Sequence, residues 1–115
     1  MTEKATALSR MSSEISLHPE ELRCINFILQ SIIPDREVWA FGSRTTTHHK
    51  PFSDLDVVVM GDNALSLEKF ADLQIAFSES DLTFKVDVVL WSELSDNFKR
   101  IIQNQYVVIR SALGH

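Results

Sequence analysis

The chain has 115 residues, of which 44% are hydrophobic and 23% charged, a composition typical of one globular domain. Its net charge of −5 gives no overall positive field for a nucleic-acid backbone, so direct nucleic-acid binding is not expected. No apolar run approaches the roughly 20 residues that cross a bilayer, and the N-terminus lacks the pattern of a signal peptide. The single Cys24 excludes an internal disulfide and a multi-cysteine zinc site. We therefore expect a cytoplasmic protein without membrane association.

The first elements in the chain are a polar start and a helix. Residues 1–17 are small and polar without a sustained period, which predicts a flexible N-terminus ahead of a single domain at 18–115. The stretch "HPEELRCINFILQSII" predicts a helix that begins near Pro19 and is stopped by Pro34. Its core face is expected from the apolar residues at helical spacing: Leu22, Ile25, Leu29, Ile32 and Ile33.

The remainder of the chain alternates strands and helices. Strands are predicted at 37–41, 54–60 and 84–91, and the unbroken valines of the second favour a central position in the sheet. Helices are predicted at 64–78, with Ser66 as a possible N-cap, and at 92–105, followed by an extended segment. The residues expected to face inward from these two helices are Phe70, Leu73, Phe77, Leu94, Phe98, Ile101 and Ile102. This order predicts an α/β (α+β) fold with a small mixed β-sheet flanked by helices.

Three acidic residues stand at or in the apolar strands. Side chains alternate along a strand, so Asp54 and Asp56 are expected on one face, where two like charges would repel. Asp87 interrupts the third strand, which should neighbour the second in so small a sheet. Its alternative is a strand-edge acid that pairs with Lys85 or faces solvent. Three converging carboxylates without histidine or cysteine favour Mg²⁺, or Mn²⁺, over zinc. Two such ions could clamp the attacking and leaving oxygens of a phosphoryl transfer.

The turn after the first strand supplies a second candidate feature. A glycine such as Gly42 lets backbone N–H groups approach a phosphate, and the Ser43 hydroxyl adds a donor. Arg44 could grip the outer phosphates of the same nucleotide. Most Gly-Ser dipeptides are plain turns, but here a strand precedes the dipeptide and the D-x-D strand follows it.

Together these residues resemble a known family. Gly42-Ser43, ten further residues and then "DLD" resemble the signature of nucleotidyltransferases of the DNA polymerase β superfamily. The length, the preceding strand and the later single acid are similar to its minimal nucleotidyltransferase (MNT) branch, over roughly residues 20–110. The resemblance implies a polymerase β-like fold with six site residues: Gly42, Ser43 and Arg44 at the nucleotide, and Asp54, Asp56 and Asp87 as metal ligands. Asp87 is also the candidate base. The loop "TTTHHKP" departs from the small residues common in the family.

The resemblance also implies a reaction and a partner. The reaction is Mg²⁺-dependent transfer of a nucleoside monophosphate, AMP from ATP, to a hydroxyl acceptor. Minimal members are commonly encoded beside a small helical HEPN protein, in many pairs a ribonuclease toxin. The implied function is an antitoxin of a type VII-like toxin–antitoxin pair that adenylylates a tyrosine of the HEPN toxin. A homodimer and a hetero-oligomer with the partner are both compatible with the sequence.

Other interpretations stay open. The helical partner could bind a small-molecule acceptor for this catalytic subunit, or the chain could be a non-catalytic antitoxin that acts by binding alone. Arg44 and His49 have the spacing of the HEPN ribonuclease motif, which belongs on a helix, so we interpret this match as coincidence. His48, His49 and Lys50 form either a solvated basic loop or a contact to phosphates or to an acidic partner.

Overall fold

The computed structural model describes residues 17–42 and 54–111. Within these ranges the helices are α2 (Pro19–Ile32), α3 (Leu67–Ser78), α4 (Asp96–Asn104) and the 3₁₀ turn η2 (Trp91–Glu93). The strands are β1 (Val38–Phe41), β2 (Leu55–Val59), β3 (Val86–Leu90) and β4 (Tyr106–Arg110). The predicted flexible N-terminus lies almost wholly outside the described residues.

The strands form one mixed sheet in the order β3-β2-β1-β4. β1 runs antiparallel to both β2 and β4, whereas β2 and β3 are parallel and joined through α3. β2 is therefore interior, and its valines 57–59 are at most 1% exposed. Both the mixed sheet and the central valine strand were expected from the sequence, because strands buried on both faces need continuous apolar side chains.

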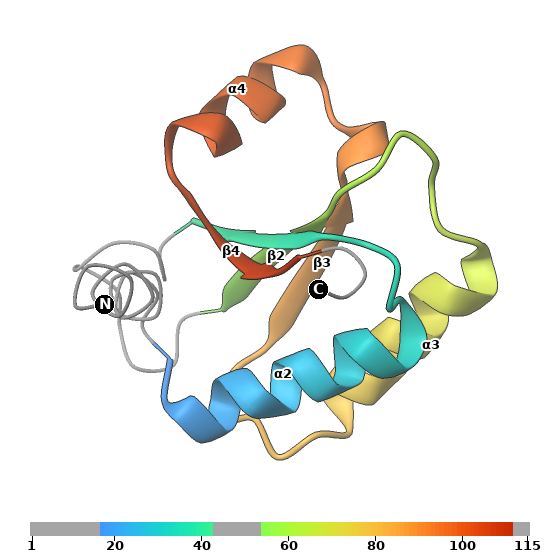
Figure 1. Ribbon diagram of the computed structural model, residues 1–115, viewed down its shortest axis with the longest axis vertical. Helices are drawn as coiled ribbons and strands as arrows, with labels where there is room; N and C mark the ends of the chain where they lie inside the picture. Colours follow the sequence, from blue (N-terminus) through green and yellow to red (C-terminus); the bar gives the residue numbers. More distant parts are fainter. Residues whose placement is uncertain (1–16, 43–53, 112–115) are drawn as a thin grey trace, which may run out of the picture.

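Helices cover both faces of this sheet, as Figure 1 shows, with α2 and α3 on one side and α4 on the other. The larger apolar core lies under α2 and α3 and includes the fully buried Ile25, Leu29 and Leu73. A smaller cluster on the α4 side contains Phe41, Val58 and Ile102. The same strands therefore have one closely covered face and one face that a single short helix covers in part.

Capping residues set the starts of the helices. The backbone N–H of His18 donates to Glu21 Oε1 at 2.9 Å, directly before Pro19 begins α2. Ser66 accepts from the backbone N–H of Lys69 at 3.1 Å, so the expected N-cap is confirmed and α3 begins one residue later.

The helix predicted at 92–105 is wrong at its start. Residues 91–93 form η2, Leu94 is extended, and α4 begins only at Asp96. The cause is Ser95, whose hydroxyl accepts from the backbone N–H of Phe98 at 3.1 Å and so caps a new helix. Trp91, expected on a strand, belongs to η2 instead.

The expected inward face of α4 is also partly wrong. Ile102 is 1% exposed, but Ile101 is 55% exposed. Successive helical residues point about 100° apart, since 3.6 residues make one turn, so only one of these two isoleucines can face the sheet. No helix in residues 17–42 and 54–111 is long and apolar enough to span a membrane.

Candidate functional site

The acidic residues predicted from the sequence meet at one end of the sheet. Asp54 directly precedes β2, Asp56 is the second residue of β2, and Asp87 is the second residue of β3. In the parallel β2–β3 pair, Asp56 is the register partner of Asp87, so both side chains lie on the face that α4 covers. The structure therefore brings the acids of two strands together, as the sequence led us to expect.

The charges of these carboxylates act on one another. Burial raises the pKa of Asp56 above its ordinary value of 3.8, and the charges of Asp87 and then Asp54 raise it further. The ionised form of Asp56 is thus disfavoured by its surroundings. A cation placed among the three would remove the repulsion and favour the ionised form.

Asp87 also forms an ion pair with Lys85, as the alternative interpretation of this residue predicted. Lys85 Nζ lies 3.4 Å from Asp87 Oδ1, and the two side chains are 72% and 39% exposed. Exposed ion pairs of this kind contribute little free energy, typically below about 1 kcal/mol. Because the lysine is so exposed, it can move away from Asp87 when another cation arrives. Asp87 can therefore pair with Lys85 when no metal ion is bound and still serve as a ligand when one is.

Gly42 directly follows β1 and lies against the side chain of Asp56. Its φ is +88°, a left-handed conformation that favours glycine. A Cβ built on Gly42 would lie 2.5 Å from Oδ2 of Asp56, too close for any other residue without a shift of the carboxylate. The turn that ends β1 therefore packs its backbone directly against the acid site.

Several predicted site residues lie outside the described residues. These are Ser43 and Arg44, for which phosphate contacts are predicted, and the loop residues His48, His49 and Lys50. Their roles stay predictions.

The donor set suits a hard cation. Three carboxylates without a thiolate or an imidazole are the oxygen ligands that Mg²⁺ and Mn²⁺ prefer. Over residues 17–42 and 54–111, however, no three or more His, Cys, Asp or Glu side chains are arranged so that they could hold a metal ion as they stand. The pKa of Asp56, raised by burial and then by the charges of Asp87 and Asp54, is the observation that fits a cation here. Asp54, Asp56 and Asp87 are the residues that would hold it.

One neighbour of the acids was not singled out from the sequence. Tyr106 is the register partner of Phe41, which is itself the partner of Asp56. Its ring stacks on that of Trp39, with centroids 3.9 Å apart and an interplanar angle of 15°. An aromatic residue at the start of a strand was the only sequence signal. Its nearness to the acids depends on strand order, which local sequence does not give.

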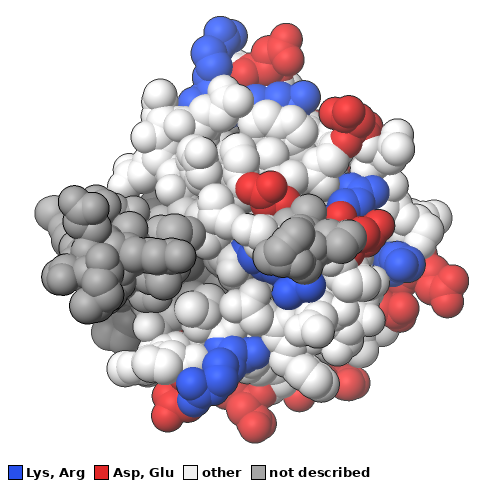
Figure 2. Space-filling model, viewed as in Figure 1, with Lys and Arg blue, Asp and Glu red and all other residues white. Residues whose placement is uncertain are grey.

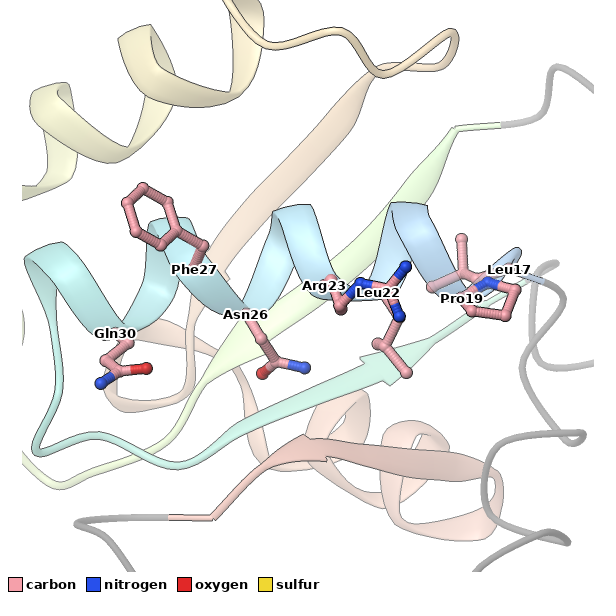
Figure 3. Close-up of a pocket in the computed structure, with 7 residues that line it drawn as sticks. All are labelled: Leu17, Pro19, Leu22, Arg23, Asn26, Phe27 and Gln30. Carbon is pink, nitrogen blue, oxygen red and sulfur yellow. The ribbon is translucent and has the colours of Figure 1, made fainter.

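Charge and shape were also compared on the face seen in Figure 2 and along α2. Figure 2 shows acidic and basic side chains interspersed over the face in view, without a continuous basic area. A shallow cavity of about 580 Å³ runs along α2, and Figure 3 shows its lining side chains projecting from this helix and from Leu17 before it. Phe27 in its wall is 72% exposed. None of the lining residues belongs to β2 or β3, so this cavity is separate from the acids.

The strand, the glycine turn and the acids are those expected of a nucleotidyltransferase, and comparison with known proteins agrees. The family model described as "Polymerase beta, Nucleotidyltransferase" matches residues 26–112. The chain belongs to this family, and the predicted class of enzyme is confirmed.

Particular relatives sharpen the family assignment. The chain is 41% identical over 98 residues to the Haemophilus influenzae protein named Probable protein adenylyltransferase MntA, covering 85% of this chain and 86% of that one. It is 28% identical over 102 residues to Protein adenylyltransferase MntA of Thermococcus cleftensis, covering 89% and 95%. These matches confirm the resemblance to the small stand-alone branch.

Solved structures show the same fold. A crystal structure of a toxin–antitoxin with AMP-PNP superposes with a TM-score of 0.66 at 22% identity, covering 79% of this chain and 73% of that chain. A tri-AMPylated Shewanella oneidensis HEPN toxin in complex with MNT antitoxin gives a TM-score of 0.59 at 22% identity, covering 79% and 70%. The predicted polymerase β-like fold is therefore confirmed.

Proposed function

We propose that this chain is a Mg²⁺-dependent protein adenylyltransferase that transfers AMP from ATP to a tyrosine of a HEPN toxin, as the antitoxin of a type VII-like pair. The observation that carries the chemistry is the register pair of Asp56 and Asp87 beside the Gly42 turn. The partner and the transferred group are supported by relatives, which include proteins named MntA adenylyltransferases and an MNT antitoxin in complex with a HEPN toxin. An ATP substrate supports a cytoplasmic location for the proposed reaction.

Each residue has a distinct part in the proposed reaction. Asp54, Asp56 and Asp87 would hold Mg²⁺, which when bound supplies positive charge for the phosphates. Gly42 lets the turn after β1 approach those phosphates, where Ser43 and Arg44 are predicted to add donors. Positioning and charge neutralisation supply most of the rate enhancement in such a transfer.

Asp87 is the candidate to receive the acceptor proton. The acceptor oxygen forms a bond to the α-phosphorus while the bond from that phosphorus to the bridging oxygen breaks, and pyrophosphate leaves with the electron pair. The proton of the acceptor hydroxyl passes to a carboxylate. Asp87 is suited to this step because its side chain is 39% exposed at the edge strand β3, where an acceptor from another molecule can reach it.

The proposal is tested by transfer of radiolabelled AMP from ATP to the purified HEPN partner. The double variant Asp54→Asn, Asp56→Asn should lower the rate by on the order of a thousandfold or more, since ligands of a catalytic cation support several kcal/mol of transition-state stabilisation. Asp72→Asn is the matched control, because Asp72 is an exposed acid on α3. Undiminished transfer by the double variant would contradict the assigned site.

The same assay separates the remaining interpretations. If the double variant still neutralises the partner although transfer has stopped, neutralisation works by binding alone. If label appears on a small molecule bound by the partner rather than on protein, the chain is a catalytic subunit with a different acceptor.

A further inference from the structure

The acids and the glycine turn do not themselves offer a binding surface for the base of a nucleotide. Both features act on phosphates and their cation, whereas a nucleoside triphosphate also carries a base, whose flat apolar faces are bound best by an aromatic ring. An aromatic surface that serves the base must lie on the same face of the sheet as the acids and within reach of them. The β-sheet register identifies such a surface.

Four residues form one row across the sheet. The register pairs join Asp87 to Asp56, Asp56 to Phe41, and Phe41 to Tyr106. Directly opposed residues share a face, so all four side chains project on the α4 side. Neighbouring strands lie about 4.8 Å apart, so Tyr106 stands about 10 Å from Asp56 along the row. That separation is comparable with the length of a nucleoside monophosphate.

Asp87 and Tyr106, at the two ends of the row, are more exposed than Phe41 in its middle. Phe41 in the middle is 9% exposed, and the ring of Phe98 from α4 meets it edge to face at 5.8 Å. Tyr106 at the end is 39% exposed. One side of its ring is occupied by Trp39.

Trp39, on which the Tyr106 ring stacks, is held by two further contacts. Trp39 Nε1 donates to Glu37 Oε2 at 2.6 Å, and the Trp91 ring meets the Trp39 ring edge to face at 5.7 Å. Lys99 Nζ lies 5.3 Å from the centre of the Trp91 ring. An exposed aromatic ring stacked on an anchored indole is preorganised to receive another flat ring.

We infer that Tyr106, supported by Trp39, is the stacking platform for the base of the nucleotide whose phosphates lie at Asp56 and Gly42. This inference rests on the proposed function, because the acids must hold the phosphates for the row to place the base. Stacking accepts any base, since every base has a π-face, so the platform supplies affinity without selecting adenine.

The test compares two probes on three variants. Binding of the magnesium complexes of a non-hydrolysable ATP analogue and of inorganic tripolyphosphate, which has no base, is measured by calorimetry. Tyr106→Leu should weaken binding of the ATP analogue about tenfold, within the range found for loss of one base–aromatic stack, and leave tripolyphosphate binding unchanged. Tyr106→Phe should retain the affinity of the native chain. Ile75→Ala, which removes a 53% exposed side chain from α3, is the control for a general surface effect.

The possible outcomes separate the platform from the proposed function. Equal loss for both probes in Tyr106→Leu, or no loss for either, overturns the platform while leaving the acid site in place. A native chain that neither binds the ATP analogue nor transfers AMP overturns the proposed function and the platform together. Loss of partner binding alone in Tyr106→Leu also overturns the platform, and assigns the exposed ring to a protein contact.

Discussion

The two faces of the sheet are built from the same strands but differ in what covers them. On one face α2 and α3 bury a continuous apolar core, in which Leu29 and Leu73 are completely inaccessible. On the other face α4 covers a small aromatic cluster and leaves Asp87 and Tyr106 accessible. Burial of apolar side chains stabilises the fold, whereas charge on the second face opposes it. In this short chain, the apolar core that stabilises the fold and the group of acidic residues therefore lie on opposite faces of one sheet.

The largest expected effect is a loss of stability on the face of the sheet that α2 and α3 cover. Leu29→Ala should lower the free energy of unfolding by about 2–5 kcal/mol, because its 0% exposed side chain leaves a cavity that α2 and the sheet cannot fill. Ile101→Ala on α4 is the control and should change it by no more than about 0.5 kcal/mol, since this side chain is 55% exposed. Urea denaturation measures both. Similar losses in the two variants would contradict the division between the faces.

A smaller effect on stability, but a large one on activity, is expected at Gly42. Gly42→Ala should cost about 1–2 kcal/mol, because a residue with a Cβ is strained at a φ of +88°. The new methyl group would also displace the Asp56 carboxylate, 2.5 Å away, and should lower AMP transfer about a hundredfold.

Thermal unfolding and AMP transfer measure these two effects separately. Gly61→Ala gives a comparison, since Gly61 also has a positive φ, +127°, but its Cβ would meet Arg36 instead of an acid. If Gly61→Ala lowered transfer as much as Gly42→Ala, the loss would come from backbone strain and not from the site.

The smallest effect concerns the charge of Asp56. Its raised pKa means that the folded chain holds the proton more tightly than the unfolded chain. Stability therefore falls as pH rises from the ordinary value of 3.8 through the raised pKa, and it stays reduced above that. Asp56→Asn should remove this penalty and stabilise the metal-free protein at pH 7 by less than about 1 kcal/mol.

Denaturation of the native chain and of Asp56→Asn from pH 3 to pH 7, without metal, tests this sign. The advantage of the variant should grow with pH. Added Mg²⁺ should then stabilise the native chain more than the variant, because ligands that bind only the folded state raise its stability. An advantage that is constant with pH would show that burial and the neighbouring carboxylates do not raise the pKa of Asp56 in the folded chain.

Local patterns were sufficient to predict most elements and the acid site. Strand alternation placed Asp54 and Asp56 on one face, and the valines at 57–59 predicted a central strand beside Asp87. These inferences succeed because buried strands and capped helices depend on residues close together in the chain. The start of α4 was missed, although Ser95 followed by Asp96 is a helix-start signal.

What the sequence could not predict depends on contacts between distant segments. The pairing of β4 with β1 joins residues more than sixty positions apart, and no local pattern fixes its register. The position of Tyr106 in the row of the acids follows only from that pairing.

The pairing of Phe41 with Asp56 has a consequence for how this protein can diversify. The chain leaves the sheet at Gly42 and returns at Asp54, next to its point of departure, with both ends held by β1–β2 hydrogen bonding. For a segment with fixed, adjacent ends, doubling its length costs only about 0.6 kcal/mol of chain entropy. Insertions and substitutions between these two points therefore leave the spacing of the acids intact.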